Sequence, residues 1–100
     1  MDIEDWRRRI DAIDEQIVRL LNERARCALS IGRIKREANL AVHDPEREQR
    51  VLAHVMATSG GPLDDDAVRR VFACIIAEIR GLEDDHADAD APATAGGDGH

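Results

Sequence analysis

The chain has 100 residues, of which 2 % are aromatic, and a formal net charge of −7 at pH 7. This length allows one small domain, and the negative charge argues against nucleic acid as a general partner. Because aromatic residues are so few, the core must consist of Leu, Ile, Val and Ala, which favours helices over sheets. The sequence therefore predicts a single all-α domain, which we place at residues 1–84.

The first predicted element is a long helix at about residues 4–38. Apolar residues recur every three to four positions from Ile3 to Ala38, and no proline interrupts them before Pro45. At 1.5 Å per residue this helix is about 52 Å long, whereas a compact 100-residue chain has a radius of gyration of about 13 Å. Two shorter helices of the same chain cannot cover it, so we expect a homodimer in which two long helices pack together.

Two shorter helices follow the long one. Asp44 and Pro45 are typical of a helix start, because they supply a side-chain acceptor at the N-cap and a preset φ at the first helical position. The sequence TSGGP at 58–62 ends this second helix. Asp64 is the expected N-cap of a third helix, whose apolar side extends over residues 68–82.

The acidic stretch at 85–100 has few apolar residues and predicts a disordered tail. Cys27 and Cys74 lie in apolar surroundings without a metal-ligand spacing, so we interpret them as small core residues in a reducing compartment. The histidines share no ligand spacing either, and no metal is predicted. The acidic N-terminus does not resemble a signal peptide, and no apolar run is long enough to span a membrane. A cytoplasmic protein without a membrane partner is expected.

Three cations of the long helix indicate a site for an anion. Arg24 occupies an apolar position of the heptad that begins at Ile3, where a charge costs several kcal/mol unless it is paired. Lys35 lies on nearly the same face, about 16 Å further along the axis. Arg7 lies about 25 Å before Arg24, so it reaches this site only from an antiparallel partner helix. The alternatives are that Arg7 is part of a solvated face, and that Arg24 reaches solvent along its side chain or pairs with Glu23 or with a carboxylate of the second helix.

A fourth cation, Arg47, lies in the first turn of the second helix. A cation gains nothing from the positive end of the helix dipole, whereas Glu46 and Glu48 suit this position. This segment is therefore either an ordinary helix cap or part of a site that needs an arginine.

Together these motifs resemble the all-helical class of chorismate mutases. The resemblance covers about residues 5–83 and rests on R-x(2)-I-D-x-I-D, L-x-x-R, I-G-x-x-K and D-P-x-R-E, in this order and spacing. It implies a monofunctional enzyme with three helices per protomer, one long and two shorter, in an interlocked homodimer. Each of its two active sites would receive an arginine from the partner's long helix. The resemblance also makes an activating enzyme of the same pathway a candidate partner.

The implied reaction is the rearrangement of chorismate to prephenate in phenylalanine and tyrosine biosynthesis. This pericyclic [3,3] shift needs no nucleophile, metal or cofactor, but a clamp for a flexible dianion and donors near the ether oxygen, where negative charge grows. By resemblance, Arg24 and the partner's Arg7 hold the two carboxylates, and Lys35 reaches the ether oxygen.

Five further residues are placed in the site by the same resemblance. The backbone of Asp44 and the side chain of Glu48 receive the ring hydroxyl, and Arg47 supports the carboxylate side. Ile79 stands where many relatives have Ser, and Glu83 stands where many have Gln. Glu83 would donate a hydrogen bond only when protonated, which predicts activity that declines as pH rises through neutrality. The alternative for Glu83 is the first residue of the acidic tail.

Three hypotheses about the function remain open from the sequence. The D-P-E-R-E motif and Glu48 favour chorismate mutase, whereas Ile79 leaves open an isochorismate pyruvate-lyase or an amino-chorismate mutase on the same scaffold. The third hypothesis is a non-catalytic helical dimerisation module. It predicts that Arg24→Ala leaves the stability of the fold unchanged or raises it.

Overall fold

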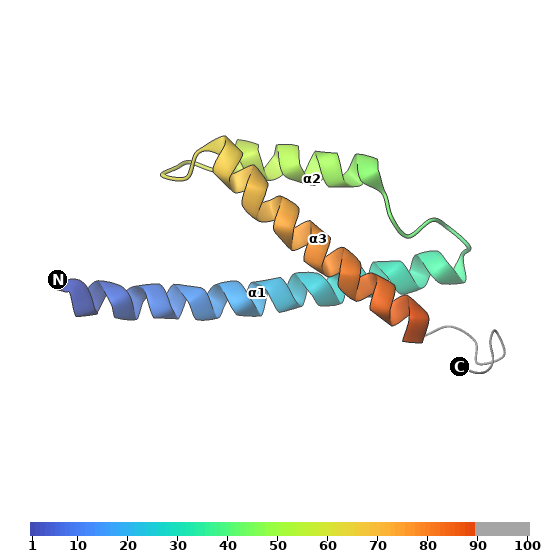
Figure 1. Cartoon of the computed structure of the whole chain (residues 1–100), viewed down its shortest axis with the longest axis horizontal. Coiled ribbons are helices and arrows are strands. Elements are labelled where there is room, and N and C mark those ends of the chain that lie inside the picture. Colours follow the sequence, from blue (N-terminus) through green and yellow to red (C-terminus); the bar gives the residue numbers. More distant parts are fainter. Residues whose placement is uncertain (90–100) are drawn as a thin grey trace.

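The computed structural model describes residues 1–89, which form three α-helices: α1 (Ile3–Glu37), α2 (Pro45–Thr58) and α3 (Asp65–Ala89). The predicted all-α fold is therefore confirmed. Figure 1 shows α3 running diagonally from the end of α2 across α1. Within this described part, no helix combines the length and apolarity that a membrane span requires.

Helix α1 has 35 residues and begins in a capping box. The Asp5 backbone N–H donates to the Asp2 carboxylate at 2.9 Å, and the Asp2 N–H donates to the Asp5 carboxylate at 3.1 Å. Both otherwise unpaired donors at the helix start are thereby satisfied. The helix begins and ends one residue before the predicted positions, so the long helix is confirmed.

A tight turn ends α1 and returns the chain toward its last turns. The Leu40 N–H donates to the Lys35 carbonyl at 2.7 Å, and the Asn39 N–H donates to the Arg36 carbonyl at 3.1 Å. Asn39 has a φ of 58°, the left-handed conformation that asparagine tolerates better than most residues. The segment before α2 therefore lies beside the C-terminal end of α1.

The two shorter helices start at the predicted caps. The carboxylate of Asp44 accepts from the Arg47 N–H at 3.0 Å, and that of Asp64 accepts from the Ala67 N–H at 2.8 Å. Between α2 and α3, Gly61 has a φ of 85°, which favours glycine in this turn.

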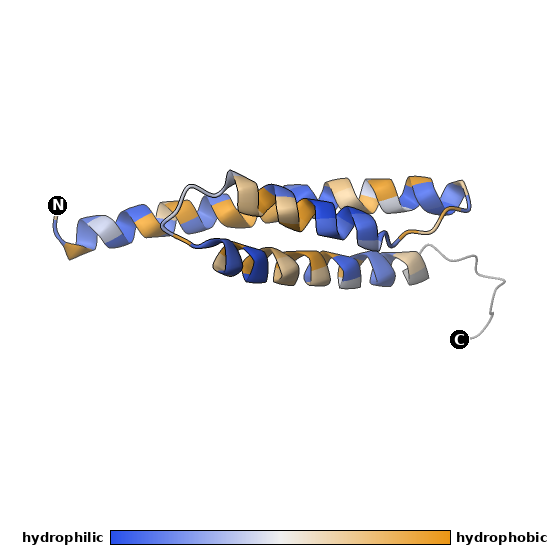
Figure 2. Ribbon diagram, turned by 90° about the horizontal axis from the view of Figure 1, so that it is seen from above, coloured by the Kyte–Doolittle hydropathy of each residue, from blue (hydrophilic) through white to orange (hydrophobic). Residues whose placement is uncertain are grey.

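Helix α3 joins the other two helices. It packs against both α1 and α2, whereas the described helices α1 and α2 have no close backbone contact with each other. The buried apolar side chains are Leu52 of α2 with Val68 and Ile79 of α3. Figure 2 shows apolar segments recurring along each helix beside hydrophilic ones, as expected for amphipathic helices.

The N-terminal half of α1 projects beyond its contact with α3 (Figure 1). Its apolar side chains are exposed in the single chain: Ile3, Trp6, Ile10, Ile13, Ile17, Val18 and Leu20. The radius of gyration is 17.9 Å, well above the value of about 13 Å for a compact chain of this length. The single chain therefore leaves a long apolar stripe without cover.

Two sequence predictions need correction. Residues 85–89 continue α3 instead of belonging to a disordered tail, because local contacts extend the helix: Asp84 pairs with His43 at 2.8 Å, and Nδ1 of His86 lies 3.1 Å from the Leu82 carbonyl oxygen. The rest of the predicted tail, residues 90–100, lies outside the described residues. Cys27 and Cys74 are exposed and unpaired rather than core residues.

Candidate active site

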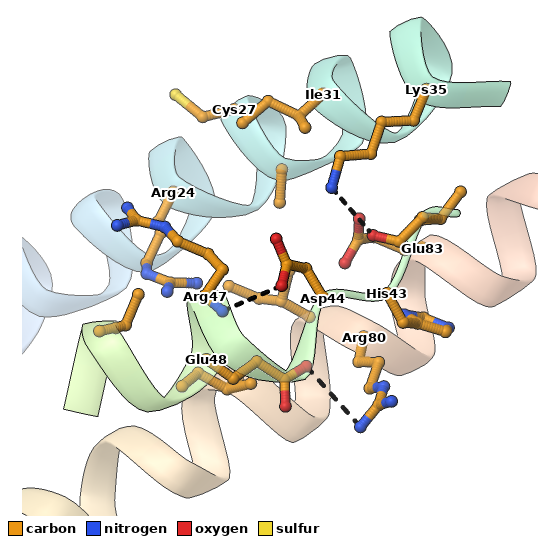
Figure 3. Close-up of a pocket in the computed structure, with 15 residues that line it drawn as sticks. Arg24, Cys27, Ile31, Lys35, His43, Asp44, Arg47, Glu48, Arg80 and Glu83 are labelled. Atoms are coloured by element: carbon orange, nitrogen blue, oxygen red, sulfur yellow. Dashed lines mark hydrogen bonds and ion pairs between the residues drawn. The ribbon is translucent and has the colours of Figure 1, made fainter. Parts of the chain in front are cut away.

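A pocket of about 270 Å³ lies between α1 and the start of α2, with α3 along its third side (Figure 3). Seven of the eight predicted site residues line it: Arg24 and Lys35 of α1, Asp44, Arg47 and Glu48 at the start of α2, and Ile79 and Glu83 of α3. Helical spacing explains the α1 contribution, because residues eleven positions apart return to nearly the same face. The residues predicted from separate motifs are thus brought to one place.

Arg7 is the predicted site residue that the pocket of this chain lacks. It lies in the exposed half of α1, where its side chain is 68 % exposed and pairs with Glu4 at 2.8 Å. An exposed pair of this kind contributes little to stability. Its role in a site of another protomer stays a prediction.

Lys35 and Glu83 lie at one end of the pocket, and Arg24 and Arg47 lie at the other (Figure 3). The Lys35 ammonium group donates to the Val42 carbonyl oxygen at 3.4 Å. Arg24 is half-buried, whereas Arg47 is exposed. Cations at both ends of one pocket suit a ligand that carries two separated negative charges.

Burial raises the pKa of the Glu83 carboxyl group above its usual range. Asp84 acts in the same direction, whereas the positive charges of His43, Lys35 and Arg36 oppose it without cancelling it. A carboxyl group with a raised pKa holds its proton to higher pH and then donates a hydrogen bond.

Gly32 lets the Glu83 carboxyl group approach α1 closely. A Cβ atom at position 32 would lie 3.3 Å from Oε2 of Glu83 and 3.3 Å from Nη1 of Arg36. Both distances are tighter than ordinary contacts. The glycine of the I-G-x-x-K motif therefore makes room for a pocket side chain.

Arg80 is a pocket residue that the sequence analysis missed. Its Nη1 lies 3.7 Å from Oε2 of Glu48, so it joins α3 to the first turn of α2. The available signal was helical spacing, because Ile76, Ile79, Arg80 and Glu83 share the side of α3 that lines the pocket. Ile79 and Glu83 were placed in the site by the family resemblance, and helical spacing from them would have pointed to Arg80 as well.

The arrangement favours electrostatic binding over covalent or metal chemistry. Arginines bind carboxylates with two parallel hydrogen bonds, and a lysine offers a compact charge. In residues 1–89, no three His, Cys, Asp or Glu side chains are grouped so that they could hold a metal ion. The pocket is thus suited to an organic dianion.

A family model described as chorismate mutase type II matches residues 6–84. The chain belongs to the chorismate mutase type II family. A solved structure of chorismate mutase (form II) from Thermus thermophilus superposes with a TM-score of 0.80 at 36 % identity, covering 82 % of this chain and 93 % of that one. The family resemblance read from the motifs is therefore confirmed.

Curated relatives of two kinds share this family domain. The bifunctional chorismate mutase/prephenate dehydratase of Aquifex aeolicus is 40 % identical over 86 residues, which cover 82 % of this chain and 24 % of the relative. The chorismate mutase of Methanocaldococcus jannaschii is 27 % identical over 78 residues, covering 77 % of this chain and 79 % of that protein. The chain thus spans about a quarter of the length of the bifunctional relatives.

Proposed function

We propose that this chain is a chorismate mutase that rearranges chorismate to prephenate. The observation that supports it best is the pocket in which Arg24, Lys35 and Arg47 meet Glu48 and Glu83, within a chain of the chorismate mutase type II family. Chorismate has two carboxylates, an ether oxygen and a ring hydroxyl, and the pocket offers a group for each.

The proposed mechanism is a clamp that acts on a reaction without covalent intermediates. The arginines hold the two carboxylates, so the flexible substrate is kept in the chair-like shape from which the new bond forms. Lys35 donates to the ether oxygen, where negative charge grows as the C–O bond breaks. Glu83 adds a second donor in its protonated form. Each donor aimed at a developing charge contributes about 10²–10³ in rate.

The remaining pocket residues orient the ring. The Glu48 carboxylate and the backbone of Asp44 receive the ring hydroxyl, and Arg47 supports a carboxylate. Ile79 supplies an apolar wall, and its side chain is also part of the buried core. This wall replaces the hydroxyl contact that many relatives have at this position.

We further propose that the enzyme is a homodimer and that the partner's Arg7 completes each site. The support is the exposed apolar stripe on the same half of α1 as Arg7. An antiparallel partner helix would cover this stripe and bring its Arg7 to the pocket, since Arg7 and Arg24 of one helix lie about 25 Å apart.

The pathway context belongs to the same proposal. The relatives from Aquifex aeolicus and Pseudomonas aeruginosa are named for chorismate mutase and prephenate dehydratase together. This supports a role in which prephenate passes on to phenylalanine and tyrosine biosynthesis. We also propose an activating enzyme of this pathway as a partner. Adding that enzyme to the chorismate assay and measuring the change in rate tests this proposal. The unpaired cysteines support a cytoplasmic, reducing compartment.

The deciding experiment mixes the purified protein with chorismate and follows the loss of its ultraviolet absorbance. We expect prephenate as the product, identified against pyruvate plus an aromatic acid. Release of pyruvate from isochorismate, with no prephenate from chorismate, would instead indicate a lyase. If neither compound is turned over and Arg24→Ala folds at least as stably as the wild type, the chain is a non-catalytic module.

A further inference from the structure

We propose that Arg80 is a positioning residue, which holds the Glu48 carboxylate in place to receive the hydroxyl of the substrate. This inference rests on the proposed function and extends it to a residue outside the family motifs in the sequence. Through Arg80, α3 would contribute a charge to substrate recognition, which the apolar side chain of Ile79 cannot supply.

The contact joins two helices at the edge of the pocket. Nη1 of Arg80 lies 3.7 Å from Oε2 of Glu48, an ion pair rather than a hydrogen bond. The Glu48 side chain is 27 % exposed and the Arg80 side chain is 43 % exposed, so the pair is partly shielded from water. Figure 3 shows the Arg80 side chain reaching the Glu48 carboxylate from the α3 side of the pocket.

The contact with Arg80 distinguishes Glu48 from the other carboxylates of its turn. Asp44 and Glu46 also lie at the start of α2, so three negative side chains share a short segment. Glu46 is directed to solvent, where it is 90 % exposed and lies 4.0 Å from Arg50. Arg80 instead contacts Glu48, the carboxylate that lines the pocket.

The geometry leaves the carboxylate able to bind a ligand. A carboxylate accepts hydrogen bonds at both oxygens. Pairing through Oε2 restricts the rotation of the Glu48 side chain while Oε1 keeps its capacity to accept a hydroxyl. Because Arg80 already restricts the Glu48 side chain, Glu48 loses less conformational entropy when the substrate binds.

A structural role and a direct ligand role make different predictions. If Arg80 only linked α2 to α3, its loss would change stability and not the Michaelis constant. If Arg80 bound a substrate carboxylate itself, its loss would weaken binding even without Glu48. Only a positioning role predicts that replacing Arg80 no longer changes KM once the Glu48 carboxylate has been replaced.

The test is a double-mutant cycle on chorismate turnover with Arg80→Met, Glu48→Gln and the double variant. We expect Arg80→Met to raise KM about fivefold with a smaller change in kcat, the scale of a partly exposed ion pair. In the Glu48→Gln background the same substitution should change KM less than about twofold. Arg80→Lys should restore most of the loss, because a lysine keeps the charge.

The control is Arg70→Met, which removes an exposed arginine of α3 that lies about 15 Å nearer the start of the helix and outside the pocket lining. It should leave KM unchanged, and thermal melts should show every variant folded. Should Arg80→Met fold poorly, Arg80→Gln takes its place in the cycle. An unchanged KM in Arg80→Met, or an equal effect with and without Glu48, overturns the Arg80 proposal alone. A wild type that does not convert chorismate overturns the proposed function and this inference together.

Discussion

The Lys35 ammonium group lies 3.4 Å from the Val42 carbonyl oxygen, across the turn between α1 and α2. The bond fixes the position of the cation without neutralising it, because a carbonyl carries no net charge. Val42 is held there by the turn at Asn39, whose hydrogen bonds return the chain to α1. The folding of this turn therefore positions a positive charge for a ligand.

Replacing Lys35 by Met should reduce kcat about 10²–10³-fold, because a donor to the developing charge is lost while the apolar stem is kept. The measurement is chorismate turnover at saturating substrate, with thermal melts to show that folding is retained. Arg33→Met is the matched control, since Arg33 is an exposed cation of the same helix segment. A Lys35→Met enzyme with wild-type kcat would remove Lys35 from the mechanism.

The activity should fall as pH rises through the raised pKa of Glu83. Burial raises this pKa, so the carboxyl group keeps its proton to higher pH than a free glutamic acid. In the proposed mechanism the protonated form donates to the ether oxygen, which the ionised form cannot do. We expect kcat/KM to be highest on the acidic side and to decline as the proton leaves.

Two variants test this pH dependence. Glu83→Gln donates at every pH and should flatten the profile. His43→Gln removes a positive charge that lowers the Glu83 pKa, so the decline should move to higher pH. A wild-type rate that does not change with pH would contradict the role of Glu83 as a donor.

Gly32→Ala should lower the activity without lowering the thermal stability. Alanine favours the helix by about 1 kcal/mol over glycine, so the thermal stability should not fall. The added Cβ would lie 3.3 Å from Oε2 of Glu83, which must then shift away from α1. We expect kcat to fall about threefold to tenfold, because small displacements of catalytic groups are costly.

The control for this substitution is Gly81→Ala in α3, where an added Cβ meets no atom within 4 Å. It should raise the melting temperature and leave kcat unchanged. If Gly32→Ala behaves in the same way as Gly81→Ala, the close approach of Glu83 to α1 has no part in catalysis.

Arg7→Ala should lower activity about 10²-fold although Arg7 lies outside the pocket of its own chain, because a carboxylate of the substrate loses its partner. Mixing Arg7→Ala with Lys35→Ala should then restore about a quarter of wild-type activity, since half of the dimers are mixed and each has one intact site. Subunits are exchanged by refolding the mixture. Arg8→Ala, another exposed arginine of this turn, serves as the control. A mixture no more active than its components would show that Arg7 does not act across subunits.

The sequence predicted those features that depend on local chemistry. Asp44 and Asp64 cap their helices as expected, because capping involves residues only three positions apart. The common face of Arg24 and Lys35 follows from the helical repeat alone. Regular spacing within one helix is therefore sufficient to place Arg24 and Lys35 on the same side, whereas the other predicted pocket residues were placed by the family resemblance.

The missed features depend on how helices cross. The pairs Arg80–Glu48 and His43–Asp84 each link α3 to a distant segment, and their partners are set by packing rather than by spacing. The His43–Asp84 pair also links the acidic end of α3 to the segment before α2. Composition alone gave no sign of a partner for these acids.

If a second copy covers the apolar stripe of α1, as proposed, the stability and activity of the protein depend on its concentration. Where most of a helix can bury its apolar face only against a second copy, association and folding become one equilibrium, governed by mass action. The melting temperature should then rise as the protein is concentrated. A loss of specific activity on dilution would report two α1 helices separating, with every residue of the pocket still present.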